Sequence, residues 1–139
     1  DFKESHSKSA TLSIKGKIDE PVIADKNQMK RVLDNLIDNA LRHSEVVTGD
    51  RTAALEISRG TSPPQCFIDV IDDGDGVPES LQPRLFEPFF TTSPEGTGLG
   101  LYLCKELCES NGVDIHYRRT TDGRSSFRLS LRLQREDAR

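Results

Sequence analysis

The chain has 139 residues, of which 34% are hydrophobic and 30% are charged, and this composition predicts one soluble globular domain. No apolar run approaches the ~20 residues that a membrane-spanning helix needs. The formal net charge of −4 argues against a nucleic-acid-binding protein, although an anionic small ligand can still bind where helix N-termini and a few basic side chains meet.

The first half of the chain predicts an edge strand, a long helix and a pair of strands. Residues 1–10 are polar and are expected to fray, and residues 11–18 alternate apolar and polar side chains. Asp25 is the expected N-cap of a helix that runs to about Ser44. Turn residues at 48–50 and 60–64 delimit strands at about 53–59 and 65–72. The core face of the helix is expected to contain Met29, Leu33, Leu36, Ile37, Ala40 and Leu41.

The second half predicts a helix followed by a hairpin. A short helical turn near 79–81 should stop at Pro83. Residues 98–110 predict a second long helix that ends at Asn111-Gly112. Residues 114–120 and 125–133 alternate across an Asp-Gly turn and predict a hairpin, and 134–139 are expected to be a solvated tail.

About five strands and two long helices in mixed order predict an α/β two-layer sandwich, in which the helices cover one face of a mixed sheet. We expect a single domain over 1–139, with a core at about 11–133. Because the chain lacks an initiating Met, we also expect it to be a piece of a longer protein.

Three cysteines, Cys66, Cys104 and Cys108, form neither a CxxC pair nor an even disulfide framework. No His or Cys lies near enough in sequence to complete a metal site with them. We therefore expect buried thiols and a reducing, cytoplasmic setting, and whether the parent protein is membrane-anchored is left open.

A polar stripe runs along the first predicted helix. At ~100° per residue, Asn35, Asn39 and Arg42 fall close to one line. Asn is a mediocre helix former, and a plain solvent face more often carries Glu, Lys or Gln. An amide oxygen can coordinate Mg²⁺ and Arg42 can reach phosphate, so a ligand site and a solvated face are both open interpretations of this helix alone.

The acidic loop Asp72-Asp-Gly-Asp-Gly76 follows a predicted strand. A calcium loop is excluded by its register, because Ile71 would occupy a ligand position. We expect Asp72 to be a buried acceptor for an exocyclic amine such as adenine N6, with Gly74 and Gly76 allowing the backbone to approach the base. A glycine-rich turn with solvated carboxylates is the alternative.

Residues 85–92, Leu-Phe-Glu-Pro-Phe-Phe-Thr-Thr, place three Phe in a segment without a regular period. We expect Phe86 to anchor the loop on the core, and Phe89 and Phe90 to belong to a lid or to contact a partner.

The run Gly96-Thr-Gly-Leu-Gly-Leu101 then opens a helix, whose first N–H groups can bind phosphate. It is not a Rossmann fingerprint, because a Pro-containing loop precedes it in place of a strand. It is not a Walker loop either, because no GK[ST] follows.

In this order the four segments resemble the boxes of sensor histidine kinases: 35–43 the N box, 72–76 the first glycine box, 85–90 the F box and 96–101 the second glycine box. The resemblance covers about 11–133. It implies the ATP-binding catalytic domain, with the Bergerat fold shared by gyrase, heat-shock chaperones, histidine kinases and MutL. The short segment between the last two boxes looks like the nitrogen-regulation type, and the run 89–109 is similar to the kinase of the type IV pilus two-component pair.

The resemblance also implies a role for each matching residue. Asn39 would be the Mg²⁺ ligand with Asn35 beside it, Arg42 would contact phosphate, His43 would flank the base and Asp72 would accept from adenine. Asn35, Asn39 and Arg42 would form the catalytic set. The other expected ATP contacts are Gly74, Gly76, Val77, Phe90, Thr91, Gly96, Thr97, Gly98, Leu99, Gly100 and Leu101.

One position helps to choose among the activities of this superfamily. Its ATPases resemble one another in a Glu four residues before the metal-binding Asn, where this chain has Asn35. An amide cannot take a proton as a general base at neutral pH, so the sequence argues against intrinsic hydrolysis. His6, His43 and His116 match no phosphoacceptor pattern, so the acceptor should lie outside this chain.

We therefore expect an ATP-dependent protein histidine kinase domain that binds ATP and Mg²⁺ and donates the γ-phosphate to a histidine on a separate dimerisation domain. The expected partners are that phosphoacceptor domain of the same parent and a cognate response regulator, with no nucleic acid. The isolated domain is expected to be a monomer and the parent a homodimer. An ATPase module and a non-enzymatic adapter are the alternatives.

Overall fold

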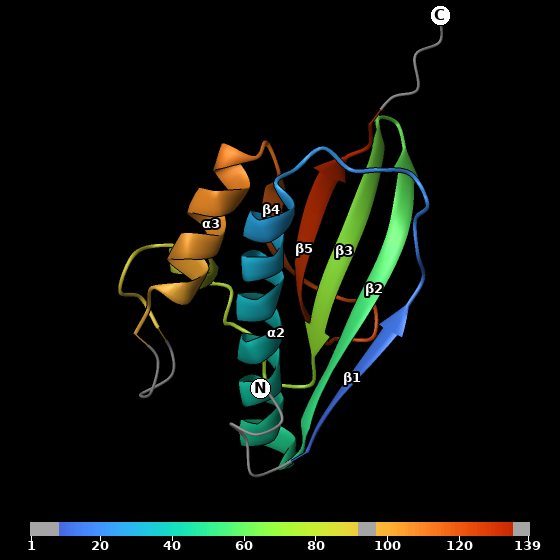
Figure 1. Cartoon of the computed structure of the whole chain (residues 1–139). Coiled ribbons are helices and arrows are strands. Elements are labelled where there is room, and N and C mark those ends of the chain that lie inside the picture. Colours follow the sequence, from blue (N-terminus) through green and yellow to red (C-terminus); the bar gives the residue numbers. More distant parts are fainter. Residues whose placement is uncertain (1–8, 92–96, 135–139) are drawn as a thin grey trace, which may run out of the picture.

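Five strands form one mixed sheet, and two long helices cover one of its faces (Figure 1). The computed structural model describes residues 9–91 and 97–134. The strands are β1 (Ala10–Lys15), β2 (Arg51–Thr61), β3 (Pro64–Asp72), β4 (Asp114–Arg119) and β5 (Ser125–Arg132). The helices are α2 (Lys26–Thr48) and α3 (Gly100–Ser110), with a single 3₁₀ turn η1 (Gln82–Arg84) between them. The predicted two-layer α/β sandwich is confirmed.

The strand order in the sheet is β1-β2-β3-β5-β4, with β1 parallel to β2 and every other pair antiparallel. The register places Leu55, Val70 and Phe127 in one row on the helix-covered face. It also places Asp72 at the end of β3 directly opposite Ser125 at the start of β5. Loops that are distant in sequence therefore meet at this end of the sheet.

Helix α2 begins where the sequence predicts and ends one turn later. The Asp25 carboxylate accepts a hydrogen bond from the Gln28 N–H at 2.9 Å, which confirms the expected N-cap. The helix continues past Ser44 to Thr48 because Gly49, with φ 86°, is the first residue that favours a C-cap. Ser44 itself is fully buried.

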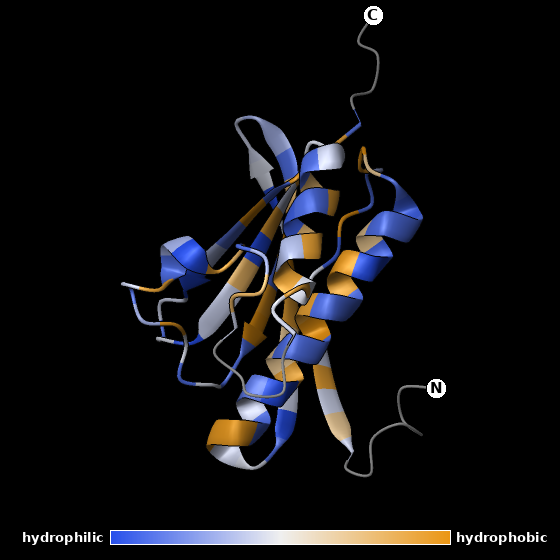
Figure 2. Ribbon diagram, turned by 90° about the vertical axis from the view of Figure 1, so that its left-hand side faces the viewer, coloured by the Kyte–Doolittle hydropathy of each residue, from blue (hydrophilic) through white to orange (hydrophobic). Residues whose placement is uncertain are grey.

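The core face of α2 differs in part from the prediction. Val32 and Leu36 are fully buried, whereas Leu33 and Ile37 are only half-buried against the core. Figure 2 shows hydrophobic residues recurring along both long helices, on the sides that pack together and on the sheet. Cys104 and Cys108 on α3, and Cys66 on β3, are buried free thiols, as expected.

Backbone geometry explains the boundaries that were predicted wrongly. Gly16 has φ 87° and lies against the Ile57 carbonyl, so β1 ends at Lys15 and not near residue 18. Gly98 has φ 77°, which no α-helix accepts, so α3 begins at Gly100. Pro83 lies inside η1 and does not stop a helix at 79–81, because the first turn of a helix leaves N–H groups unpaired and proline loses nothing there.

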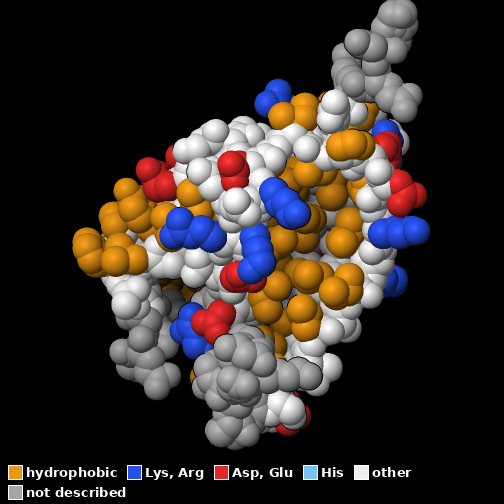
Figure 3. All heavy atoms as spheres, in the orientation of Figure 1, with side chains coloured by type: hydrophobic (Ala, Val, Ile, Leu, Met, Phe, Trp, Pro, Cys, Tyr) orange, Lys and Arg blue, Asp and Glu red, His pale blue; other side chains and the backbone are white. Residues whose placement is uncertain are grey.

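Other expectations concern the ends of the chain and membrane insertion. The expected fraying at 1–10 and the expected tail at 134–139 fall almost wholly outside the described residues. No helix in residues 9–91 and 97–134 is both long and apolar enough to cross a membrane. Figure 3 shows hydrophobic side chains gathered over the strands beside α2. Ile14, on the edge strand β1, is 64% exposed.

Candidate functional site

A cavity of about 370 Å³ opens between α2, the loop after β3 and the segment that leads into α3. Its walls come from segments that span the chain from α2 to β5. The sequence-predicted residues that line it are Asn35, Asn39, Arg42, His43, Val77, Phe90, Thr91, Thr97, Gly98, Gly100 and Leu101.

Not every predicted residue lines this cavity. Asp72, Gly74, Gly76 and Leu99 lie next to lining residues and are not in the lining itself. Gly96 lies outside the described residues. The structure thus brings three of the four sequence segments into the wall and places the acidic loop 72–76 just behind it, with Val77, the next residue, in the wall.

Sequence reasoning missed five lining residues: Asp38, Leu85, Tyr117, Ser125 and Phe127. Asp38 could have been found, because it lies one helical turn before Arg42 on the same polar side of α2. Tyr117, Ser125 and Phe127 belong to strands whose alternation indicates only a core face. Only the pairing of β5 with β3 and β4 places them under the cavity.

The polar stripe of α2 is organised by hydrogen bonds before any ligand binds. The Asn35 Nδ2 donates to the Arg31 carbonyl at 3.1 Å, and its Oδ1 is directed toward Gly100 at the start of α3. The Arg42 Nη2 donates to the Asn39 Oδ1 at 3.5 Å. Two amide groups and one guanidinium therefore line the same cavity as Gly100 and Leu101, the first residues of α3.

Asn39 carries an unfulfilled hydrogen-bonding group. Its Nδ2 is buried and has no partner among the described residues. A buried donor left unpaired costs about 1–3 kcal/mol, so a ligand that satisfies it is favoured. Rotating the amide by half a turn exchanges the positions of its oxygen and nitrogen. The side chain can therefore donate from nitrogen to an oxygen-rich anion or offer its oxygen to a hydrated cation. Among residues 9–91 and 97–134 no cluster of three or more His, Cys, Asp or Glu could hold a metal ion.

Asp72 is buried at the end of β3, with 3% of its surface exposed. The Gly74 N–H donates to its Oδ1 at 2.8 Å. Desolvation by burial raises the pKa of this carboxyl to about 6, with the Gly74 hydrogen bond and Arg119 opposing and Asp73 adding to the shift. A Cβ at Gly74 would lie 2.9 Å from this carboxylate and 3.1 Å from His43, so only glycine fits here.

His43 lines the cavity beside this loop. Burial, with a smaller contribution from the Arg42 charge, lowers its pKa below the ordinary value. The imidazole is therefore neutral at pH 7, and it can contact a flat uncharged group without introducing charge.

Residues 85–90, which resemble the F box, approach the cavity from the side of α3. Phe90 lines it, with the Arg84 guanidinium 4.7 Å from the ring centroid. Phe86 packs against the core in an edge-to-face contact with Phe127, which confirms its expected anchoring role. Phe89 is 74% exposed with φ 67°, and its N–H donates to the Gly98 carbonyl at 2.8 Å. This bond joins the end of the F box to the segment that leads into α3; residues 92–96, on which most of the expected lid falls, lie outside the described residues.

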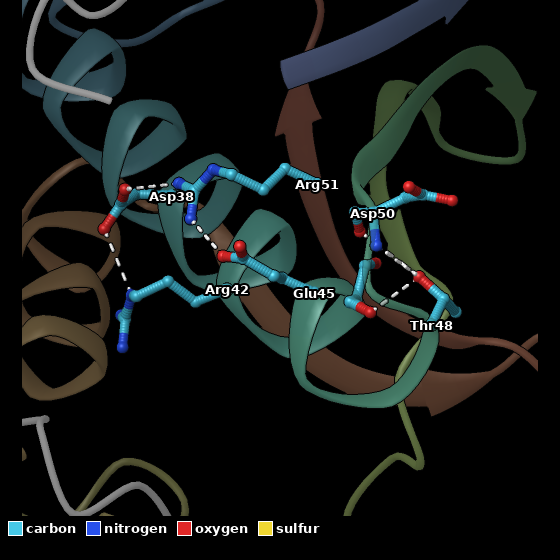
Figure 4. Close-up of polar contacts among 7 residues, drawn as sticks. Asp38, Arg42, Glu45, Thr48, Asp50 and Arg51 are labelled. Carbon is cyan, nitrogen blue, oxygen red and sulfur yellow. Dashed lines mark hydrogen bonds and ion pairs between the residues drawn. The ribbon is translucent and has the colours of Figure 1, made fainter. Parts of the chain in front are cut away.

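A network of ion pairs on α2 and β2 holds the Arg42 side chain in place. Figure 4 shows Asp38 between the guanidinium groups of Arg42 and Arg51. The Arg42 Nε donates to Asp38 at 3.3 Å, and the Arg51 Nη2 lies 3.9 Å from the same carboxylate. The Arg51 Nη1 donates to Glu45 at 2.9 Å, and its side chain is only 7% exposed. Arg42 thus points into the cavity from a fixed base.

Residues 24–135 match the family described as "Histidine kinase-, DNA gyrase B-, and HSP90-like ATPase". The chain is 46% identical over 107 residues to the sensor protein kinase PilS of Pseudomonas aeruginosa, a match that covers 77% of this chain and 20% of PilS. It is 34% identical over 126 residues to the sensor histidine kinase GtrS of the same species, covering 89% of this chain and 24% of GtrS. The chain therefore spans about a fifth of the length of the curated relatives it matches.

The fold is similar to solved catalytic domains of histidine kinases. A nucleotide-free structure of the catalytic domain of histidine kinase ThkA superposes with a TM-score of 0.70 at 27% identity. That match covers 88% of this chain and 78% of the ThkA chain.

Proposed function

Because the chain belongs to the family of histidine kinase-, DNA gyrase B- and HSP90-like ATPases, we propose that it binds ATP with Mg²⁺ and donates the γ-phosphate to a histidine on a separate domain of a sensor kinase. One observation carries the proposal: Asn35, Asn39 and Arg42 line one cavity of about 370 Å³ together with the first residues of α3. We propose the whole chain as a single ATP-binding catalytic domain.

The adenine base would bind at the sheet end of the cavity. The ionised Asp72 carboxylate accepts from the exocyclic amine, and Ser125, its partner in the sheet, lies in the wall beside it. Val77 and Phe127 supply apolar contacts for the faces of the base. Neutral His43 borders the same region, so the base subsite is mostly apolar with a single charged acceptor.

The phosphates would lie between α2 and α3. The first N–H groups of α3 have no acceptors within the helix, and they carry the positive end of its dipole. Arg42 opposes them from α2 and neutralises charge as the γ-phosphate leaves. Gly100 presents no side chain on the side that faces Asn35, whereas the absence of a side chain at Gly98 is required by the Phe89 backbone, which a Cβ would approach to 2.4 Å.

The amide groups of the α2 stripe fit a hydrated Mg²⁺. Asn39 and Asn35 would hold it through oxygen, the ligand atom that Mg²⁺ prefers, while waters and phosphate oxygens complete its shell. When bound, the ion neutralises phosphate charge and fixes the orientation of the triphosphate. The supporting observation is that the Asn39 Nδ2 has no partner among the described residues and its Oδ1 accepts only the long 3.5 Å bond from Arg42, so the amide can turn its oxygen to the ion at little cost.

Hydrolysis of ATP is the competing activity, and one residue of the cavity wall could support it. Asp38 is a carboxylate in the cavity wall that could orient water in place of the missing Glu. Its oxygens already contact the Arg42 Nε at 3.3 Å and the Arg51 Nη2 at 3.9 Å, so the carboxylate is not free to orient a water. We therefore propose phosphotransfer, with the phosphoacceptor domain and response regulator as partners, in a homodimeric, cytoplasmic catalytic region.

The test supplies the chain with the dimerisation domain of its own parent as a separate polypeptide and with ATP labelled at the γ-phosphate. We expect acid-labile label on a histidine of the added domain and none on the chain alone. Rapid Mg²⁺-dependent phosphate release by the chain alone, lost in Asp38→Asn, would overturn phosphotransfer in favour of hydrolysis.

A further inference from the structure

We infer that Tyr117 and Arg119 of β4, which lie outside all four sequence segments, hold loop 72–77 in the shape that recognises the base and thereby set affinity and purine selectivity. The inference rests on the proposed function for its ligand. Its structural part, the attachment of the loop to β4, can be measured without any nucleotide.

Tyr117 contacts both the loop and the cavity. The Val77 N–H donates to its phenolic oxygen at 2.9 Å. The ring lines the cavity and packs edge-to-face on Phe127, with centroids 5.2 Å apart. Because the ring is held by Phe127, its hydroxyl is a fixed acceptor, and Val77 is placed where the face of the base would lie.

Arg119 attaches the middle of the same loop. Its Nη2 donates to the Asp75 carbonyl at 3.0 Å, and its Nη1 donates to the Gly123 carbonyl at 3.1 Å. One guanidinium thus connects the acidic loop to the β4–β5 turn. Because a guanidinium is planar and rigid, the two carbonyl groups are held at a set separation.

The fit between the loop and β4 is close. Gly76 has φ 79°, and a Cβ there would lie 2.6 Å from the Arg119 guanidinium and 2.8 Å from the Tyr117 hydroxyl. This glycine is therefore required by contact with β4, and not only by the approach of a base. The two strand residues and the loop form one packed unit.

Other hydrogen bonds hold the loop at points different from those that contact β4. The Asp73 N–H donates to the Ser44 hydroxyl of α2 at 2.9 Å, at the opposite end of the loop. The Val77 carbonyl accepts from the Gln82 side chain at 3.0 Å. Residues 73–76 form no ladder pairs, and the Thr52 hydroxyl of β2 donates to the Asp73 carboxylate at 2.9 Å. The attachments at Ser44, Thr52 and β4 therefore determine where Asp72 and Val77 stand relative to each other.

Tyr117→Phe is the sharpest variant, because it removes one oxygen and keeps the ring. We expect affinity for a non-hydrolysable ATP analogue to fall about three- to tenfold, the effect of one lost hydrogen bond. We also expect the ratio of ATP to GTP affinity to fall, because a displaced loop no longer aligns Asp72 with the 6-amino group, which adenine carries and guanine lacks. Arg119→Ala should act in the same direction. Arg118→Ala is the matched control, since Arg118 is exposed and alternates to the other face of β4.

Amide hydrogen exchange tests the attachment directly. The Val77 amide should exchange at least about tenfold faster in Tyr117→Phe, while the Leu129 amide in the core of the sheet stays unchanged. Unchanged Val77 exchange with an unchanged ATP-to-GTP ratio overturns the inference. A wild-type chain that binds no purine nucleotide, yet shows the faster Val77 exchange in the variant, refutes the proposed function and with it the selectivity role, and leaves the attachment standing.

Discussion

At the residue scale, Asp72 combines burial, charge and an expected ligand contact. Its raised pKa means that the folded state holds the proton more tightly than the unfolded chain does. The neutral carboxyl makes its full contribution to the free energy of unfolding at pH values below the ordinary pKa of 3.8. This contribution is lost as the pH rises through the folded-state pKa of about 6. At neutral pH the folded protein therefore bears the free-energy cost of a buried ionised carboxylate. A ligand that donates a hydrogen bond to this carboxylate would offset that cost.

Asp72→Asn should therefore separate function from folding. We expect ATP-analogue binding to weaken by about tenfold or more at pH 7.5, because a charged acceptor for the base amine is lost. Binding to the wild type should strengthen between pH 5 and pH 7 as Asp72 ionises, and in the variant this increase should disappear. Calorimetric titration over this pH range measures both effects. Urea denaturation should show no loss of stability at pH 7, and an unfolded variant would contradict this account.

At the element scale, α2 serves the core and the site at once. One side packs Val32 and Leu36 against the sheet and α3, and another presents the polar stripe to the cavity. Arg51 at the start of β2 ties the outer side of the helix to the sheet through Glu45 and Asp38. The helix is thus held in register by contacts that also orient Arg42.

Arg51→Ala should lower the free energy of unfolding by about 1–3 kcal/mol, because a largely buried charged hydrogen bond is removed and Glu45 is left without this partner. It should also weaken binding of ATP more than binding of adenosine, since only ATP carries the phosphates that Arg42 meets. Urea denaturation and calorimetry measure the two effects.

Arg59→Ala is the control: its ion pair with Glu20 is far more exposed, and the change should cost less than about 1 kcal/mol. Equal losses in both variants would argue against a special role for Arg51.

At the scale of the whole molecule, the site exists only where α2, α3 and the sheet meet. Ligand binding should therefore stabilise the entire domain, by an amount that grows with ligand concentration over its dissociation constant. The described residues form one cluster of buried apolar side chains, so we expect the core to fold without a metal.

We expect ATP with Mg²⁺ to raise the midpoint of thermal unfolding, and a chelator to remove most of that increase while leaving the ligand-free midpoint unchanged. Asn39→Ala should keep the ligand-free midpoint and lose the Mg²⁺-dependent part of the shift. Asn27→Ala, the same substitution at an exposed position in the first turn of α2, should keep both. Differential scanning fluorimetry measures all of these, and a chelator-sensitive midpoint without ATP would point to a structural metal instead.

Much of this molecule could be predicted from local patterns. Apolar periodicity predicted both long helices and the strands of the sheet, and Asp25 and Asn111-Gly112 marked helix ends through capping chemistry that depends only on neighbouring residues. The polar stripe of α2 and the segments around Asp72, Phe90 and Gly98 carried their chemistry in residue type and spacing. Boundaries were predicted less well, because the left-handed backbone at Gly16 and Gly98 depends on contacts with Ile57 and Phe89.

The sequence by itself determined the fold class and the chemical groups of the site, because periodicity, caps and short motifs are local properties of the chain. Only the tertiary structure decided which distant residues join them. Strand register placed Ser125 beside Asp72, β4 brought Tyr117 and Arg119 to the acidic loop, and the packing of β2 against α2 put Arg51 behind Asp38 and Arg42. These contacts cross long separations in sequence, so their geometry is set by sheet pairing and helix packing, and no local pattern encodes it.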